Sequence, residues 1–260
     1  MTGSVPNEAS PALFARYAYP PNELGFCGPT DVAAYFAAAA TGHDRRELRH
    51  LTQQFEGAWP YLELIARCSG ICDPLDREVV KAYWIGNVLT TRVPPAVLAS
   101  WCRHHFERRT SSHLSAVLAT VAGGGLPQHS FHVFAVYPWF GLLRGGREGA
   151  PLEVLDRCRI RWGRVEAVYG DTVVVRSNPL RFVGSRLELG PERSETARRT
   201  IDGVGFVPEL TTGDVVSLHW DWVCDCLSSV DRAWLQFCTR RNLAAVNALT
   251  VPGPALVCGV

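Results

Sequence analysis

The spacing of apolar residues changes about halfway along the chain, and this change constrains the fold more than any other feature. Over residues 29–125, apolar residues recur at helical spacing in segments separated by glycines and prolines. Beyond residue 151 the pattern consists of short runs rich in β-branched residues, separated by Gly-Asp, Asn-Pro and Gly-Pro pairs that are typical of turns. The sequence therefore predicts an α+β protein, with a mainly helical domain over residues 1–150 and a small β-barrel with a C-terminal helix over residues 151–260.

Capping signals place three helices. The stretch PTDVAAYFAAAATG ends at Gly42, and a glycine there can adopt the left-handed conformation that closes many helices. In DPLDREVVKAYW, Asp73 is expected to cap a helix and Pro74 suits its first turn. The stretch SSVDRAWLQFCTRRNLAAVNAL predicts an amphipathic helix near the C-terminus, with Ser228 or Ser229 as its cap.

Two apolar stretches between the halves predict strands. HSFHVFAVYPWFGLL (129–143) is rich in β-branched and aromatic residues and precedes a glycine-rich loop, so a buried strand is expected to end the helical domain. LEVLDRCRI (152–160) is expected to open the barrel as its first strand. His129 and His132 would then point to opposite faces, because side chains alternate along a strand. This histidine pair is therefore not expected to bind one ligand.

Composition excludes several classes of function. The chain contains 26 Lys and Arg against 25 Asp and Glu, a formal net charge of +1. Nucleic-acid-binding domains usually carry a clear basic excess, so no nucleic-acid partner is expected. No uncharged apolar run is long enough to span a bilayer and the N-terminus lacks the pattern of a secretion signal, so no membrane association is expected. The nine cysteines are then expected to be reduced thiols of a cytoplasmic protein.

Two motifs in the C-terminal part occur in the order of a known family. Cys158 is followed by Gly163, a basic residue, a valine and then a Gly-Asp turn. Farther along, GDVVSLHWDWV (213–223) places His219 within an apolar strand. In this order and spacing the motifs resemble the HypC/HupF family of NiFe hydrogenase assembly chaperones, and the resemblance covers residues 156–245.

The resemblance implies a fold, a role and a site. It implies a small HypC-like (OB-like) β-barrel with a C-terminal helix, and a non-enzymatic accessory role in hydrogenase maturation. The cargo would be iron carrying cyanide and carbonyl ligands, and the partner the large-subunit precursor or an iron-delivering maturation protein. Cys158 and His219 would be the metal ligands, with Cys224 as a possible additional thiol. A thiolate and a neutral imidazole suit such an iron centre.

Core packing is the competing interpretation of these residues. A cysteine at the start of a strand usually fills a core, and a histidine within an apolar strand is usually hydrogen-bonded there. Cys158 and His219 are 61 residues apart (158 to 219), so only the closing of the barrel could bring them together.

An enzyme is the alternative function. Cys27, in a Cys-Gly-Pro sequence before a predicted helix, resembles the nucleophile of papain-like cysteine hydrolases. A helix N-terminus lowers the pKa of a thiol and so favours the reactive thiolate. His132 would be the base and Asp156 the carboxylate that orients it. The order Cys, His, Asp resembles that of the bacteriocin-processing double-glycine peptidases.

Overall fold

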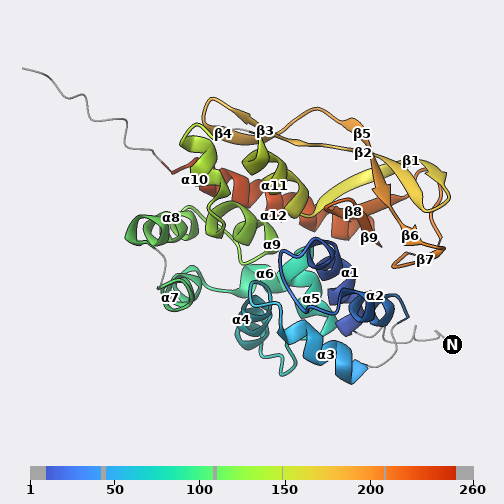
Figure 1. Cartoon of the computed structure of the whole chain (residues 1–260). Helices are drawn as coiled ribbons and strands as arrows, with labels where there is room; N and C mark the ends of the chain where they lie inside the picture. Colours follow the sequence, from blue (N-terminus) through green and yellow to red (C-terminus); the bar gives the residue numbers. More distant parts are fainter. Residues whose placement is uncertain (1–9, 42–44, 108–109, 148, 208, 250–260) are drawn as a thin grey trace, which may run out of the picture.

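The computed structural model describes residues 10–41, 45–107, 110–147, 149–207 and 209–249. The described part of the N-terminal half is helical, as predicted (Figure 1). Its helices are α1 (Ser10–Glu23), α2 (Val32–Thr41), α3 (Arg45–Gln53), α4 (Trp59–Ser69), α5 (Arg77–Trp84), α6 (Val88–Arg92), α7 (Pro95–His105) and α8 (Ser111–Ala122).

The predicted caps have different outcomes. Helix α2 is confirmed, but Gly42 lies outside the described residues. Helix α5 begins at residue 77 rather than 74, because Asp76 is its cap and accepts a hydrogen bond from the Glu78 backbone N–H. The predicted cap Asp73 instead accepts from the Leu75 N–H at 2.9 Å and forms an exposed ion pair with an arginine of α3.

The two strands predicted between the halves are wrong, because both stretches are helical. They form α9 (His129–Phe131), the π-helix η1 (His132–Val136), α10 (Trp139–Arg144) and α11 (Ala150–Cys158). Periodicity cannot distinguish a buried strand from a buried helix when an apolar run is short. The side chains of Val133, Phe134 and Val136 are all buried, so the run shows no exposed face that would reveal a helical period.

The C-terminal part contains short strands and one long helix, as predicted. The elements are β1 (Arg161–Tyr169), β2 (Thr172–Ser177), β3 (Leu180–Val183), β4 (Arg186–Leu189), β5 (Arg193–Arg198), β6 (Thr200–Ile201), β7 (Val204–Gly205), β8 (Val215–His219), β9 (Trp222–Cys226) and α12 (Ser229–Asn247). Ser228 caps α12 by accepting a hydrogen bond from the Asp231 backbone N–H.

Five of the strands form one strongly curved sheet in the order β1-β2-β5-β9-β8. Strand β1 pairs antiparallel with both β2 and β8. The ring of pairings is completed by a single residue pair between β5 and β9, Arg198 with Trp222. The molecule is therefore a mixed helix-and-strand protein with a C-terminal helix, and its sheet closes at only one point. None of the described helices is long and apolar enough to cross a membrane.

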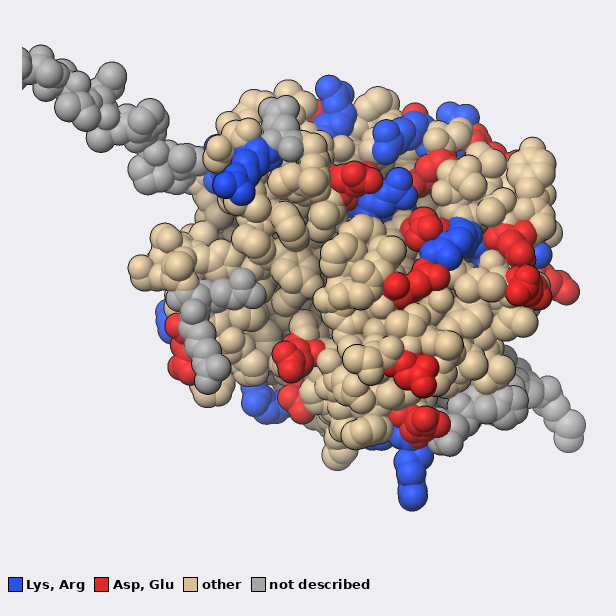
Figure 2. All heavy atoms as spheres, viewed as in Figure 1, with Lys and Arg blue, Asp and Glu red and all other residues tan. Residues whose placement is uncertain are grey.

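The two halves share one apolar core. Its largest cluster of buried side chains includes Phe14 and Trp84 from the helical half together with Val216 and Trp222 from the sheet. Helix α1 lies between the halves, and α12 crosses the middle of the molecule (Figure 1). The core therefore continues across residue 150, where the periodicity changes. On the face drawn in Figure 2, acidic and basic side chains lie interspersed on a largely uncharged surface.

Candidate metal centre

Three buried side chains with metal-binding atoms meet between the two halves. They are His129 from α9, Cys158 at the end of α11 and His219 at the end of β8. One ligand atom from each lies within 4.8 Å of the others, and no other group of this kind occurs among the described residues. The side chains are 5%, 6% and 1% exposed, respectively. The structure thus brings together the two predicted ligands, Cys158 and His219, and adds His129.

Main-chain contacts explain why Cys158 and His219 are neighbours. The hairpin between β8 and β9 turns at Trp220, whose φ of 52° lies in the left-handed region. In this turn the Trp220 N–H donates a hydrogen bond of 2.7 Å to the carbonyl of Arg157 in the last turn of α11. Because Trp220 follows His219 and Arg157 precedes Cys158, this bond places the two side chains at one point.

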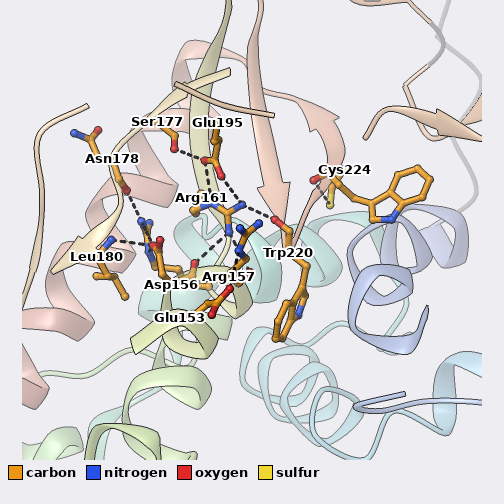
Figure 3. A network of polar contacts seen from close by, with 12 residues as sticks. Glu153, Asp156, Arg157, Arg161, Ser177, Asn178, Leu180, Glu195, Trp220 and Cys224 are labelled. Atoms are coloured by element: carbon orange, nitrogen blue, oxygen red, sulfur yellow. Dashed lines mark hydrogen bonds and ion pairs between the residues drawn. The ribbon is translucent and has the colours of Figure 1, made fainter. Parts of the chain in front are cut away.

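Arg161 fixes the same junction, because its guanidinium lies between Glu195, Trp220 and the end of α11 (Figure 3). Its guanidinium, only 2% exposed, donates to the carbonyl oxygen of Trp220 and to the carbonyls of Asp156 and Arg157, the latter two at 3.2 Å. It also pairs with the Glu195 carboxylate of β5 at 3.2 Å. A buried guanidinium with so many partners holds a rigid geometry, because moving one partner would leave a charge unpaired. Arg161 therefore locks α11, the hairpin and β5 together.

Arg159 anchors the end of α11 to the neighbouring β-hairpin. Its buried guanidinium donates to the Asp156 carboxylate at 2.9 Å and to the carbonyl of Asn178 at 2.5 Å. The Asp156 carboxylate also accepts from the backbone N–H of Leu180 at 2.9 Å. Burial lowers the pKa of Arg159 to about 10, so the group is still charged at neutral pH. Asp156 thus holds the helix end in place.

The hydrogen bonds of His219 define its tautomer. Its Nδ1 lies 2.6 Å from the carbonyl oxygen of Tyr17 in α1. A carbonyl oxygen only accepts, so Nδ1 carries the proton and Nε2 carries the lone pair. Nε2 is buried without a hydrogen-bond partner. Burial and the neighbouring His129 lower the pKa of His219, so the ring is neutral. A neutral imidazole with one nitrogen held by a carbonyl is the usual form of a histidine metal ligand.

His129 is also neutral, but both its nitrogens have partners. Nε2 lies 2.8 Å from the Cys158 carbonyl oxygen and therefore donates, and Nδ1 lies 3.1 Å from the Tyr83 hydroxyl, which donates to it. Burial lowers the pKa of His129 to about 4. His129 was not predicted as a ligand, because the strand expected there would have pointed it and His132 to opposite faces, whereas His129 lies in α9. Its position in a buried apolar run was the only signal.

The Cys158 thiol is protonated in the absence of a cation. Burial raises its pKa, and the nearby Cys27 adds to the effect. A positive charge beside a thiol, such as a metal ion, stabilises the thiolate. Without a neighbouring positive charge, Cys158 is therefore a poor nucleophile.

Cys224, the possible additional thiol, lies outside the group of three. A β-bulge interrupts the pairing of β8 with β9 at this point. The Cys224 side chain is fully buried, and its thiol donates a weak hydrogen bond of 3.8 Å to the carbonyl of Trp222. Burial raises its pKa as well.

The residues of the alternative hydrolase lie in different surroundings from those predicted. Cys27 lies five residues before Val32, where α2 begins, and burial raises its pKa to about 12, whereas a helix N-terminus would lower it. His132 begins a π-helix rather than a strand, and its Nδ1 lies 3.2 Å from the Tyr61 hydroxyl. Asp156 lies within α11 and is held by the guanidinium and backbone contacts described above.

Comparisons with known proteins place the chain in a family. Residues 6–252 match a family of unknown function, DUF6390. No curated protein and no solved structure matches the chain. Because the match spans the helical half, the curved sheet and all three side chains of the candidate metal centre, we conclude that this chain belongs to the DUF6390 family.

Proposed function

We propose that this protein is an accessory protein of NiFe hydrogenase maturation. In this role it binds the iron centre, or the large-subunit precursor that receives it, through its HypC-like C-terminal region. The observation that carries the proposal is the proximity of Cys158 and His219. They are 61 residues apart in sequence (158 to 219), and yet their ligand atoms lie within 4.8 Å at one buried site. These are the two residues that the resemblance to the HypC/HupF chaperones marks as ligands.

The chemistry of Cys158 and His219 supports binding and transfer of iron rather than catalysis. A thiolate and a neutral imidazole are ligands that low-spin ferrous iron accepts. The hydrogen bond to Tyr17 holds the proton of His219 on Nδ1, so Nε2 can bind iron without a change of tautomer. The Cys158 thiol would lose its proton to solvent as the iron binds. An accessory protein of this kind carries its cargo and transfers it without a chemical reaction of its own.

Exposed aromatic surface beside the site supports contact with a partner. The Phe26 ring stacks on the Trp220 ring at a centroid distance of 4.8 Å. Phe26 is 58% exposed, and Trp220 directly follows His219 in the chain. A partner that receives the cargo would meet the exposed Phe26 ring, which covers the buried Trp220 ring.

The test is anaerobic affinity purification from a host that makes NiFe hydrogenase, followed by iron analysis and infrared spectroscopy. We expect wild type to carry iron with cyanide and carbonyl stretching bands, and Cys158→Ala to lose both. Cys238→Ala is the matched control, because Cys238 is also a buried thiol but lies in α12, outside the site. Wild type without iron, bands or hydrogenase proteins, together with unchanged hydrogenase activity in Cys158→Ala, would contradict the proposal.

A further inference from the structure

The third member of the candidate centre comes from outside the HypC-like region. His129 belongs to α9, which precedes the residues that carry the resemblance. Its ring nevertheless contacts the His219 ring edge to face, at a centroid distance of 5.1 Å. It also donates to the Cys158 carbonyl. The helical half therefore supplies a donor to a site that the C-terminal region alone would leave with two.

One buried atom of the group of three has no hydrogen-bond partner and is free to accept a metal ion. The Nε2 lone pair of His219 has no hydrogen-bond partner, although the side chain is only 1% exposed. Leaving a buried polar atom unpaired is unfavourable, so such atoms are rare in native proteins without a bound ion, water or ligand. A cation that accepts this lone pair would satisfy it.

We infer that His129, Cys158 and His219 form a binding site for one divalent transition-metal ion, with His129 as the third protein ligand. The donor set selects the class of ion. Two imidazoles and a thiolate suit Zn²⁺, Co²⁺ or Fe²⁺, whereas Mg²⁺ and Ca²⁺ prefer oxygen ligands. The inference shares Cys158 and His219 with the proposed function but does not depend on a hydrogenase.

Binding requires small movements and one exchange of hydrogen bonds. Metal bonds to nitrogen and sulfur are about 2.0–2.3 Å long, so tetrahedral donors lie about 3.3–3.8 Å apart. The three ligand atoms, now within 4.8 Å, would close by about 1 Å. His129 must release either the Tyr83 hydroxyl from Nδ1 or the Cys158 carbonyl from Nε2. The thiol proton leaves to solvent, so one ion replaces one proton and no redox change is needed.

The test is an anaerobic titration of the metal-free full-length protein with Co²⁺. The absorption spectrum of bound Co²⁺ depends on its ligands, so the spectrum identifies them. Wild type is expected to bind one Co²⁺ with a thiolate-to-metal charge-transfer band in the near ultraviolet. Cys158→Ser should lose the band, and His129→Gln should bind more weakly by on the order of a hundred-fold. His132→Gln is the matched control, because this nearby buried histidine lies outside the group.

A second measurement on wild type avoids any folding defect of the variants. X-ray absorption of the Zn²⁺-loaded protein is expected to show one sulfur and two imidazole ligands. The inference would be overturned if X-ray absorption shows fewer than two imidazole ligands. It would also be overturned if folded wild type does not bind Co²⁺, or if His129→Gln binds Co²⁺ with unchanged affinity. Metal binding without any effect on hydrogenase would contradict only the proposed function. A maturation defect in Cys158→Ala but not in His129→Gln would contradict only the third ligand.

Discussion

At the scale of single residues, burial controls which cysteines can react. A thiolate, not a thiol, is the nucleophile, and removing a thiol from water raises its pKa. The cysteines of this chain span both extremes, since Cys102, Cys158, Cys224 and Cys238 are buried whereas Cys72 and Cys226 are exposed. Cys27 is intermediate in exposure, yet its pKa is raised to about 12 by burial.

We predict that Cys27 is slow to alkylate. With iodoacetamide at pH 7.5, Cys27 should react slower than the exposed Cys72 by on the order of a hundred-fold, because little of it is thiolate. Mass spectrometry of peptides from timed samples measures both rates in one experiment, so Cys72 serves as the internal control. If Cys27 instead reacts fastest at mildly acidic pH, its pKa is low, and the cysteine hydrolase becomes the better interpretation.

The candidate site shows what residue spacing can and cannot reveal. Cys158 and His219 were predicted as ligands from the resemblance of their motifs to the HypC/HupF family, and no local pattern shows that the end of α11 meets the hairpin between β8 and β9. His129 was discounted as a ligand, because its position depends on a local helix and on packing against Trp84 at a ring distance of 4.7 Å. Such contacts between distant segments leave no pattern in the local sequence.

At the scale of elements, turn signals predicted the sheet better than apolar runs did. The Gly-Asp pair at residues 170–171 does separate β1 from β2, since glycine readily adopts the φ of 53° that the turn needs. The run at residues 129–143 contains no glycine or proline before Pro138, which directly precedes α10. Without an exposed face or a turn, tertiary packing decided between helix and strand.

Gly163 tests the packing of β1 against β2. A Cβ at this position would overlap the Val175 side chain and lie 2.8 Å from the Arg176 carbonyl oxygen. Gly163→Ala is therefore expected to lower the free energy of unfolding by about 1–3 kcal/mol, because the strands must move apart. Urea denaturation followed by circular dichroism measures this change.

Gly141→Ala provides the control for that experiment. Gly141 lies in α10, and a Cβ there would meet no atom within 4 Å. This variant is expected to be neutral or more stable by about 0.5–1 kcal/mol, because alanine favours a helix. Equal stability of Gly163→Ala and wild type would show that β1 and β2 leave room for a methyl group at residue 163.

At the scale of the whole molecule, helix α1 joins the helical half to the sheet. Tyr19 of α1 packs edge to face on Trp222 of β9 at 5.4 Å, and the Tyr17 hydroxyl lies 2.9 Å from the Ser217 hydroxyl of β8. The change of periodicity near residue 150 predicts two local architectures, which the structure contains. Periodicity reports only which face of an element is apolar, so it could not predict that both architectures bury their faces against the same helix.

Glu23, the last residue of α1, carries the polar part of this junction. Its carboxylate accepts hydrogen bonds from the Arg198 guanidinium of β5 and, at 3.0 Å, from the Trp222 indole of β9. Burial alone would raise the pKa of Glu23, but the hydrogen bonds from Arg198 and Trp222 more than offset it, so the pKa is lowered from its ordinary value of 4.5. The charged form of Glu23 therefore stabilises the folded protein.

We expect Glu23→Gln to lower the free energy of unfolding at pH 7 by about 1–2 kcal/mol, because charge-assisted bonds become neutral ones. Since the folded pKa is lowered, this contribution is complete above about pH 4.5 and disappears as the pH falls through the folded value. Wild type and variant should therefore converge in acid, as measured by urea denaturation at several pH values. Glu188→Gln, at an exposed position of β4, should match wild type throughout. A Glu23→Gln deficit that persists unchanged below pH 3 would mean that packing, rather than charge, holds α1 to the sheet.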